Sequence, residues 1–210
     1  MKALAKVQVV MSNSAKKLIL ASTSVYRREL LERLRIPFDV ISPKVDETPL
    51  PGENTLALAL RLAKAKASAV AKDHPAAWVI GSDQVADLCG AAIGKPGNFE
   101  RAMAQLQLMR GATVTFQTAL CLMHGSEETT INVPTEVTFR KLADDVLEAY
   151  LHAEEPYDCA GSAKSEGLGI SLLESIKSDD PTALIGLPLI ALSGLLREAG
   201  FLIPNKTSVN

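Results

Sequence analysis

The hydrophobic periodicity of this 210-residue chain changes repeatedly between two residues, which is typical of strands, and 3.6 residues, which is typical of helices. Short apolar runs are followed by segments that carry leucine and alanine on one helical face. This alternation predicts a mixed α/β fold. Predicted strands cover residues 17–21, 38–41, 78–81, 113–123 and 130–139, and predicted helices cover residues 26–34, 55–72, 99–110, 144–153 and 188–199.

The chain shows no internal repeat and no low-complexity linker, which favours one continuous domain. We expect this domain to span residues 17–203, with a tail over 204–210. Residues 45–54 and the glycine-rich residues 160–169 are predicted loops, and the last two strands form a predicted hairpin across residues 125–126. Residues 1–16 superficially resemble a signal peptide, but Lys6 and Gln8 interrupt the apolar part. A flexible extension is therefore favoured over a targeting role.

Composition excludes several classes of protein. A net charge of −2 with 4% aromatic residues lacks the basic, aromatic surface of a nucleic-acid binder. The longest uncharged apolar run, residues 183–196, contains two glycines and a proline and is too short to cross a membrane. The three cysteines are scattered with no CxxC pair, which indicates a reducing, cytoplasmic compartment and no zinc site.

The first candidate site lies where the first predicted strand meets the first predicted helix. Ser22 and Ser24 come just before the helix, and Arg27 and Arg28 lie in its first turn. Free backbone N–H groups, hydroxyls and guanidinium groups together suit a phosphate. The alternative is that Ser24 only caps the helix while both arginines are solvated.

The second candidate is Lys66 in the helix predicted over residues 55–72. At 100° per residue, Lys66 lies about 140° from Arg61, on the apolar side of this helix. Lys64 lies instead with the solvent-facing charges. An unpaired buried ammonium is costly, so Lys66 either extends past the core to solvent or meets an acidic residue or a ligand phosphate.

The third candidate is Asp83, which we expect directly after the strand over residues 78–81. A carboxylate at the end of a buried strand could hold a divalent metal or accept a proton from water, and the alternative is a simple turn at the strand exit. Glu47 adds a carboxylate on a proline-rich loop. Lys95 could contact a second phosphate or could simply lie in a turn.

Taken together, these carboxylates and cations suit magnesium-dependent chemistry on a polyphosphate. The sequence contains no Walker P-loop and no Rossmann glycine motif after a strand. The three histidines lie in ordinary contexts and suggest no Ser-His-Asp triad.

Six short motifs, in this order, resemble those of the Maf family of nucleoside triphosphate pyrophosphatases. They are LILASTSVYRRELL (18–31), VDE (45–47), LAKAKA (62–67), GSDQV (81–85), GKP (94–96) and GLPL (186–189). The resemblance covers residues 17 to about 201. It implies an elongated structure around a mixed central sheet with flanking helices. It also implies two lobes that enclose a central cleft, as in inosine triphosphate pyrophosphatases.

The resemblance also implies a role for each charged candidate. Asp83 would be the catalytic proton acceptor, with Glu47, Lys66 and Lys95 as the other charged catalytic positions. The stretch that binds substrate would include Ser22, Ser24, Arg27 and Arg28. A divalent cation, Mg²⁺ or Mn²⁺, would lie between Glu47, Asp83 and the phosphates. The implied reaction is hydrolysis of the α–β phosphoanhydride, which yields a nucleoside monophosphate and pyrophosphate.

Three positions separate the branches of this family. The branch that acts on dTTP and UTP carries proline, threonine and glutamine where this chain has Tyr26, Gln84 and Glu166. The three residues found here are similar to those of the branch that acts on 7-methyl-GTP. Methylation at N7 makes guanine cationic, so we expect Tyr26 to stack on the base and Glu166 to accept from its N1–H and N2–H donors.

Two other functions stay open at this point. One is the dTTP/UTP pyrophosphatase activity of the sister branch. The other is a noncatalytic nucleotide-binding regulator of cell division, which the family's older name, septum formation inhibitor, suggests. Many family members pair as homodimers, although nothing in the sequence identifies an interface.

Overall fold

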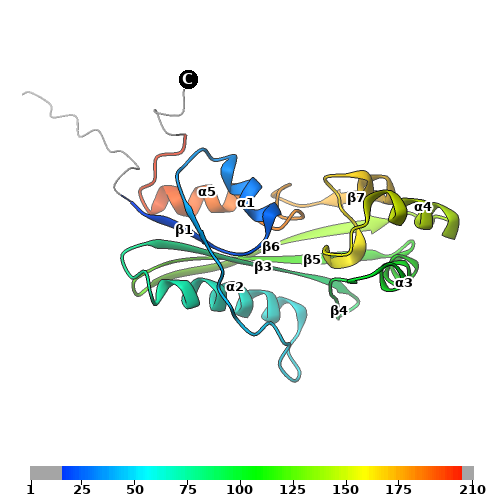
Figure 1. Ribbon diagram of the computed structural model, residues 1–210, viewed down its shortest axis with the longest axis horizontal. Coiled ribbons are helices and arrows are strands. Elements are labelled where there is room, and N and C mark those ends of the chain that lie inside the picture. Colours follow the sequence, from blue (N-terminus) through cyan, green and yellow to red (C-terminus); the bar gives the residue numbers. More distant parts are fainter. Residues whose placement is uncertain (1–15, 205–210) are drawn as a thin grey trace, which may run out of the picture.

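The computed structural model describes residues 16–204 (Figure 1). The strands are β1 (Leu18–Ala21), β2 (Asp39–Ile41), β3 (Trp78–Leu88), β4 (Ala91–Ile93), β5 (Thr113–His124), β6 (Glu127–Phe139) and β7 (Leu173–Lys177). The α-helices are α1 (Val25–Glu32), α2 (Thr55–Ala71), α3 (Phe99–Met109), α4 (Asp144–Glu154) and α5 (Leu189–Glu198). Two short 3₁₀ helices cover Ala160–Ser162 and Leu168–Leu172.

All strands belong to one mixed sheet with the order β2-β1-β3-β5-β6-β7, and β4 pairs with β3. Strand β1 runs parallel to both β2 and β3. The β3–β5, β5–β6 and β6–β7 pairs are antiparallel. The predicted mixed sheet and the predicted hairpin of the last two long strands are therefore confirmed.

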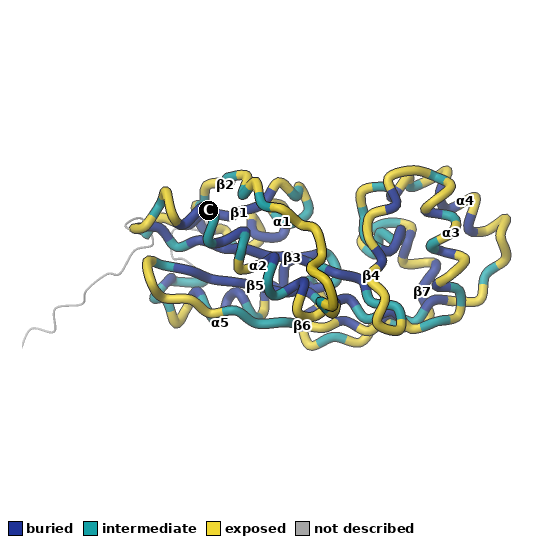
Figure 2. The backbone as a smooth tube through the Cα atoms, turned by 90° about the horizontal axis from the view of Figure 1, so that it is seen from below, coloured by how far each residue is buried: buried dark blue, intermediate teal, exposed yellow. Residues whose placement is uncertain are grey.

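Strands β3, β5 and β6 run through the length of an elongated molecule (Figure 1). At one end, the first lobe, α1 and α5 cover one face of the sheet and α2 covers the other. At the opposite end, the second lobe, α3, α4, β4 and β7 gather around the far halves of the same strands. Figure 2 shows the two lobes side by side with the long strands between them. The elongated, two-lobed shape predicted from the sequence is confirmed.

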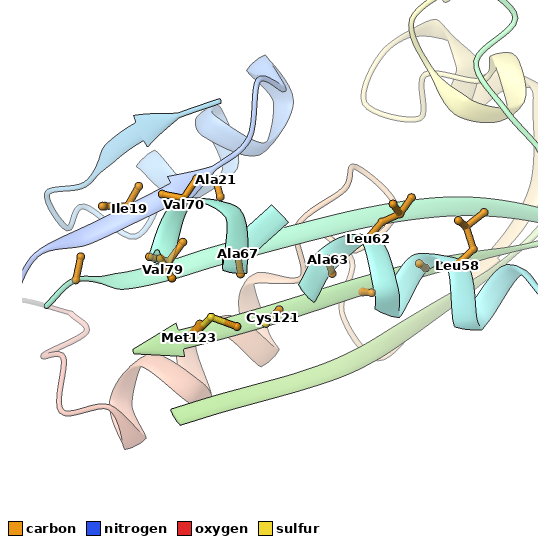
Figure 3. Close-up of a cluster of buried hydrophobic side chains, with 14 of the residues drawn as sticks. Ile19, Ala21, Leu58, Leu62, Ala63, Ala67, Val70, Val79, Cys121 and Met123 are labelled. Atoms are coloured by element: carbon orange, nitrogen blue, oxygen red, sulfur yellow. The ribbon is translucent and has the colours of Figure 1, made fainter. Parts of the chain in front are cut away.

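Each lobe has its own hydrophobic core. In the first lobe one cluster packs between α2 and the sheet and includes Ile19, Leu62, Val70 and Val79 (Figure 3). A second cluster packs α1 and α5 against the opposite face. The core of the second lobe joins α3 and α4 to the ends of the long strands. Burial of these side chains is the main stabilising contribution to the fold.

Helix α2 lies unusually close to β3 because Gly81 has no side chain. A Cβ at Gly81 would lie 2.6 Å from the backbone nitrogen of Ala67 and would also strike the Ala63 carbonyl. Any larger residue would push the helix away from the strand. The glycine therefore sets the distance between the helix that carries Lys66 and the strand that carries Asp83.

The sheet has a gap along one edge of β3. Strand β1 pairs with β3 as far as Gly81, and β4 pairs with it from Ala86 onward. Residues 82–85 thus have no strand partner on this edge, although β5 pairs with them on the other. Side chains from both faces of the sheet can reach this gap. It lies between the two lobes.

The structure corrects the sequence prediction at several elements. The strand predicted over residues 78–81 continues to Leu88, because β5 pairs with it throughout its length. Asp83 therefore lies within a strand and does not follow one. Strands β4 and β7 were not predicted, and the predicted loop over 160–169 contains 3₁₀ turns. Apart from Lys16 and Pro204, the predicted extension and tail lie outside the described residues.

Candidate active site

A crevice of about 850 Å³ opens between the lobes at the gap in the sheet edge. This volume suits a ligand of nucleotide size. The first lobe contributes the β1–α1 junction, the loop before α2, and α2 itself. The second lobe contributes the loop after β4 and the segment before the second 3₁₀ helix. The predicted site residues that line it are Ser22, Ser24, Tyr26, Arg27, Glu47, Lys66, Asp83, Gln84, Lys95 and Glu166.

Lys66 joins two acidic residues at the floor of the crevice. Its Nζ lies 2.6 Å from Asp83 Oδ1 and 2.7 Å from Glu47 Oε1. The side chains of Lys66 and Asp83 are only 7% and 9% exposed, whereas that of Glu47 is 60% exposed. The helical position of Lys66 left open an extension to solvent or an acidic or phosphate partner, and the structure shows acidic partners. Breaking such a buried pair on one side is strongly destabilising.

Burial raises the pKa of Asp83, and the positive charges of Lys66 and Arg27 oppose this rise. A higher pKa makes a carboxylate a stronger base, which suits acceptance of a proton from water. Asp83 therefore has an environment that suits general-base chemistry, and its role as proton acceptor stays a prediction.

Arg27 is fixed by a backbone carbonyl on the far side of the sheet from α2. Its Nε donates a 2.8 Å hydrogen bond to the Gly186 carbonyl oxygen. Within residues 16–204 its Nη1 and Nη2 atoms have no hydrogen-bond partner. Burial lowers the pKa of Arg27, but arginine stays charged at any ordinary pH. The guanidinium is thus a desolvated cation with donors available to an anion.

The other residues of the β1–α1 junction make different kinds of contact. Ser24 caps α1 by accepting from the backbone N–H of Arg27, so its predicted alternative role is confirmed, and it also lines the crevice. Ser22 is buried and accepts from the Ser24 backbone N–H. Arg28 points away from the crevice and pairs with Glu32 on the exposed surface of α1. The structure therefore does not place Arg28 with the other predicted phosphate contacts.

Lys95 faces the crevice from the loop that follows β4. Within the described residues its ammonium makes no hydrogen bond or ion pair, so its charge is available to a ligand. The loop is tied to the second lobe by the Gly97 backbone N–H, which donates to the Tyr157 carbonyl oxygen at 2.9 Å. Lys95 is therefore a free cation on the loop after β4, whereas Lys66 lies on α2.

The other end of the crevice is formed by Tyr26, Glu166 and two residues that the sequence did not single out. The Tyr26 hydroxyl donates to Asp158 Oδ2 at 3.2 Å and lies 3.8 Å from Cys159 Sγ. Burial raises the pKa of Cys159 to about 11, so its thiol stays protonated. Asp158 and Cys159 follow a turn at Pro156 with no recognisable motif, and only the contact with Tyr26 reveals them.

Gln84 also lines the crevice, but its amide nitrogen is occupied. It donates to the carbonyl oxygens of Ala183 and Leu184, each at 2.9 Å, and lies 3.0 Å from Thr118 Oγ1. The sequence predicted that Gln84 would help to distinguish the bases. Its amide nitrogen connects β3 to the loop before α5, and its part in distinguishing the bases stays a prediction.

The donor set of the site fits a divalent cation shared with a polyphosphate. Glu47 and Asp83 each give one oxygen to Lys66, and the second oxygen of each has no hydrogen-bond partner among residues 16–204. No group of three or more acidic, histidine or cysteine side chains in this range could hold an ion by itself. Mg²⁺ commonly binds through one or two carboxylates together with substrate phosphates.

Comparisons with known proteins agree on one family. A sequence model described as Maf-like protein matches residues 17–199. The chain is 62% identical over 192 residues to a 7-methyl-GTP pyrophosphatase of Cupriavidus metallidurans, covering 90% of this chain and 96% of that protein. It is 64% identical over 195 residues to a protein of the same name from Burkholderia thailandensis, covering 90% and 91% of the two chains.

Two solved structures resemble the chain more distantly. The Ham1 protein of Staphylococcus aureus matches with a TM-score of 0.43 and 15% identity, covering 60% of this chain and 73% of that one. A nucleoside-triphosphatase, or dITP/XTP pyrophosphatase, of Mycobacterium abscessus matches with a TM-score of 0.42 and 16% identity, covering 88% and 97%. Among the described residues, no helix has the length and apolar character needed to span a bilayer.

Proposed function

The chain belongs to the Maf-like protein family, and from this membership we propose that it hydrolyses 7-methyl-GTP to 7-methyl-GMP and pyrophosphate. Relatives that share about three fifths of its sequence over nine tenths of its length carry that activity in their names. The observation that carries the proposal is the buried Lys66–Asp83 pair at the floor of a nucleotide-sized crevice. Such a pair supplies a base and a phosphate-binding cation at one place.

In the proposed reaction Asp83 takes a proton from a water molecule that attacks the α-phosphorus. The new P–O bond forms as the bond from the α-phosphorus to the α–β bridging oxygen breaks. Pyrophosphate leaves with the bridging oxygen, and the proton taken by Asp83 then passes to solvent. Lys66 fixes the Asp83 carboxylate through its 2.6 Å contact and keeps it anionic for the next cycle.

Three cations are available to the triphosphate: Lys66 at the floor, Arg27 on the first lobe and Lys95 on the loop after β4. Positive charge placed in advance in a partly desolvated crevice lowers the energy of a transition state that accumulates negative charge on phosphate oxygens. A triphosphate in the crevice would thus meet cations from both lobes.

Glu47 and Asp83 would hold the divalent cation through their free oxygens. When bound, this ion would neutralise charge on the phosphate oxygens and make the phosphorus more open to attack. The exposed Glu47 side chain can adjust to the ion, whereas the buried Asp83 cannot.

At the opposite end, Tyr26 and Glu166 would bind the base. The ring of Tyr26 offers a π face to the positive charge that N7-methylation places on guanine. The exposed Glu166 carboxylate can accept from two guanine donors, whereas uracil and thymine offer one. Asp158 adds a second negative charge beside the ring.

A nucleotide panel scored for pyrophosphate release tests this proposal. With Mg²⁺ or Mn²⁺ present, we expect 7-methyl-GTP to have the highest kcat/KM, and a chelator should abolish turnover. Replacing Glu166→Gln should reduce the preference for 7-methyl-GTP over UTP about tenfold, because a hydrogen bond to a charged acceptor is lost. Glu174→Gln on the exposed face of β7 is the matched control and should change nothing.

Two results would overturn the proposal. Equal or faster turnover of dTTP and UTP would assign the specificity of the sister branch. Nucleotide binding without pyrophosphate release, with every metal tried, would indicate a regulator that only binds nucleotide.

The compartment and assembly of the enzyme stay predictions. All three cysteines are free thiols, which supports a reducing compartment such as the cytoplasm. Pairing as a homodimer can be checked by analytical ultracentrifugation. The absence of nucleic-acid binding can be checked by gel shift.

A further inference from the structure

The loop formed by residues 183–186, just before α5, turns three of its carbonyl groups toward the sheet. Ala183 O accepts from Gln84 Nε2 and from Thr118 Oγ1, at 2.9 and 3.0 Å. Leu184 O accepts from Gln84 Nε2 at 2.9 Å. Gly186 O lies 3.0 Å from Ser82 Oγ. The 183–186 loop is therefore attached to the central strands β3 and β5 by side-chain hydrogen bonds.

The orientation of the Gln84 amide is determined by its neighbours. Carbonyl oxygens only accept hydrogen bonds, so the amide nitrogen must face Ala183 and Leu184. A flipped amide would bring its oxygen against two carbonyl oxygens and lose both bonds. The two hydrogens on this nitrogen are shared among the two loop carbonyls and Thr118 Oγ1, so the nitrogen has no further hydrogen to donate to a ligand.

The loop in turn fixes the direction of Arg27. The Gly186 carbonyl accepts from Arg27 Nε at 2.8 Å, while Nη1 and Nη2 are left for a ligand. Gly186 has a φ of +123°, a conformation that residues with a side chain rarely adopt. A planar guanidinium held at Nε has its remaining donors fixed in a known direction, which matters because bidentate binding of phosphate depends on geometry.

From these contacts we propose that Gln84 is a positioning residue, which holds the 183–186 loop so that Gly186 directs Arg27 at the triphosphate. This inference rests on the proposed function, because it assumes that the crevice binds a polyphosphate. It assigns Gln84 to the phosphate end of the reaction and leaves base recognition to Tyr26 and Glu166. Thr118, which is fully buried, also holds the 183–186 loop through its hydrogen bond to the Ala183 carbonyl oxygen.

The variant Gln84→Met tests the proposal, because methionine keeps the length of the side chain but has no N–H group. We expect kcat/KM to fall about tenfold, and by the same factor for 7-methyl-GTP and UTP, since both carry a triphosphate but different bases. A fall confined to 7-methyl-GTP would overturn the proposal and assign Gln84 to the base. Gln107→Met on α3 is the matched control, because Gln107 contacts Asp144 outside the crevice.

A double-mutant cycle with Arg27→Ala gives a readout that general loss of packing would not move. If Gln84 acts through Arg27, the substitution Gln84→Met should lower kcat/KM by no more than about twofold in the Arg27→Ala background. If the double variant loses kcat/KM by the product of the two single losses, the two residues act independently and the proposal is overturned. Should Gln84→Met fail to fold, Thr118→Val replaces it, because valine removes the hydroxyl that donates to Ala183.

The same cycle can be measured without catalysis, as binding of inorganic tripolyphosphate by titration calorimetry. We expect Gln84→Met to weaken this binding about tenfold when Arg27 is present and hardly at all in Arg27→Ala. Equal weakening in both backgrounds would overturn the positioning role. If the wild-type protein releases no pyrophosphate from any nucleotide, the proposed function fails, while the tripolyphosphate cycle still decides the role of Gln84.

Discussion

The two ends of the crevice, which we propose bind the phosphates and the base, differ in how firmly their side chains are held. At the phosphate end, Lys66 and Asp83 are buried and joined at 2.6 Å, and a backbone carbonyl holds Arg27. At the base end, Tyr26 makes a longer, exposed hydrogen bond to Asp158, and Glu166 contacts only its neighbour Ser165. Regular helices and strands carry the first set, whereas loops of the second lobe carry most of the second.

This difference indicates that the regular helices and strands and the loops serve different parts of the reaction. The phosphate end must place a base and several charges within fractions of an ångström, and buried ion pairs on α2 and β3 provide that rigidity. The proposed base end would have to recognise one base among several, and side chains on loops can change without disturbing the core. We therefore expect substitutions at the phosphate end to reduce kcat strongly and those at the base end to alter mainly KM.

The largest effect should come from Asp83→Asn, which keeps the size of the side chain but removes the base. We expect kcat to fall about 10³-fold, within the range known for general-base catalysis. The measurement is steady-state release of pyrophosphate from 7-methyl-GTP. Asp73→Asn, an exposed aspartate beyond the end of α2, is the control. Activity of Asp83→Asn within tenfold of wild type would show that the rigid end does not supply the base.

A smaller effect should follow from Lys66→Met, where one charge is lost and the base remains. We expect kcat/KM at neutral pH to fall about 10²-fold. Lys66 is the largest of the influences that lower the pKa of Asp83, so its loss lets burial raise that pKa further. Because the base must be deprotonated, activity should then be lost at a higher pH as the solution is acidified.

The pH–rate profile of Lys66→Met measures this shift directly. Lys64→Met is the matched control, because Lys64 lies on the same helix but pairs with Glu128 on the exposed side. An acidic limb that stays in place in Lys66→Met would mean that Lys66 does not control the ionisation of Asp83.

The smallest effect should come from Tyr26→Phe at the base end. Phenylalanine keeps the ring and loses the hydroxyl's contacts with Asp158 and Cys159, so we expect KM for 7-methyl-GTP to rise about threefold with kcat unchanged. Tyr157→Phe, whose side chain packs against the core of the second lobe, is the control. A large fall in kcat for Tyr26→Phe would remove the distinction between the two ends.

Sequence reasoning predicted that Lys66 lies with acidic residues because the signals for this contact are local. Lys66 was separated from Lys64 by helical position alone, and its acidic partners are the two carboxylates that the motifs had already marked. The long helices and strands were predicted for the same reason, since their periodicity is contained within each segment.

The parts that the sequence did not predict depend on contacts between distant segments. The continuation of β3 through Asp83 depends on pairing with β5, and the role of Gln84 depends on carbonyl groups about a hundred positions away. Arg28 satisfies the motif as well as Arg27 does, but only the orientation of α1 shows that it faces Glu32. Strands β4 and β7 are short and carry no clear alternation of their own.

The three long strands that cross both lobes also determine how the protein unfolds. Because β3, β5 and β6 begin in one lobe and end in the other, neither half possesses a complete sheet that could survive excision. Loss of strand pairing in one half therefore also destabilises the strand pairing in the other half. Melting should therefore be cooperative across the whole molecule, with no stage in which one half stays folded while the other is a random coil.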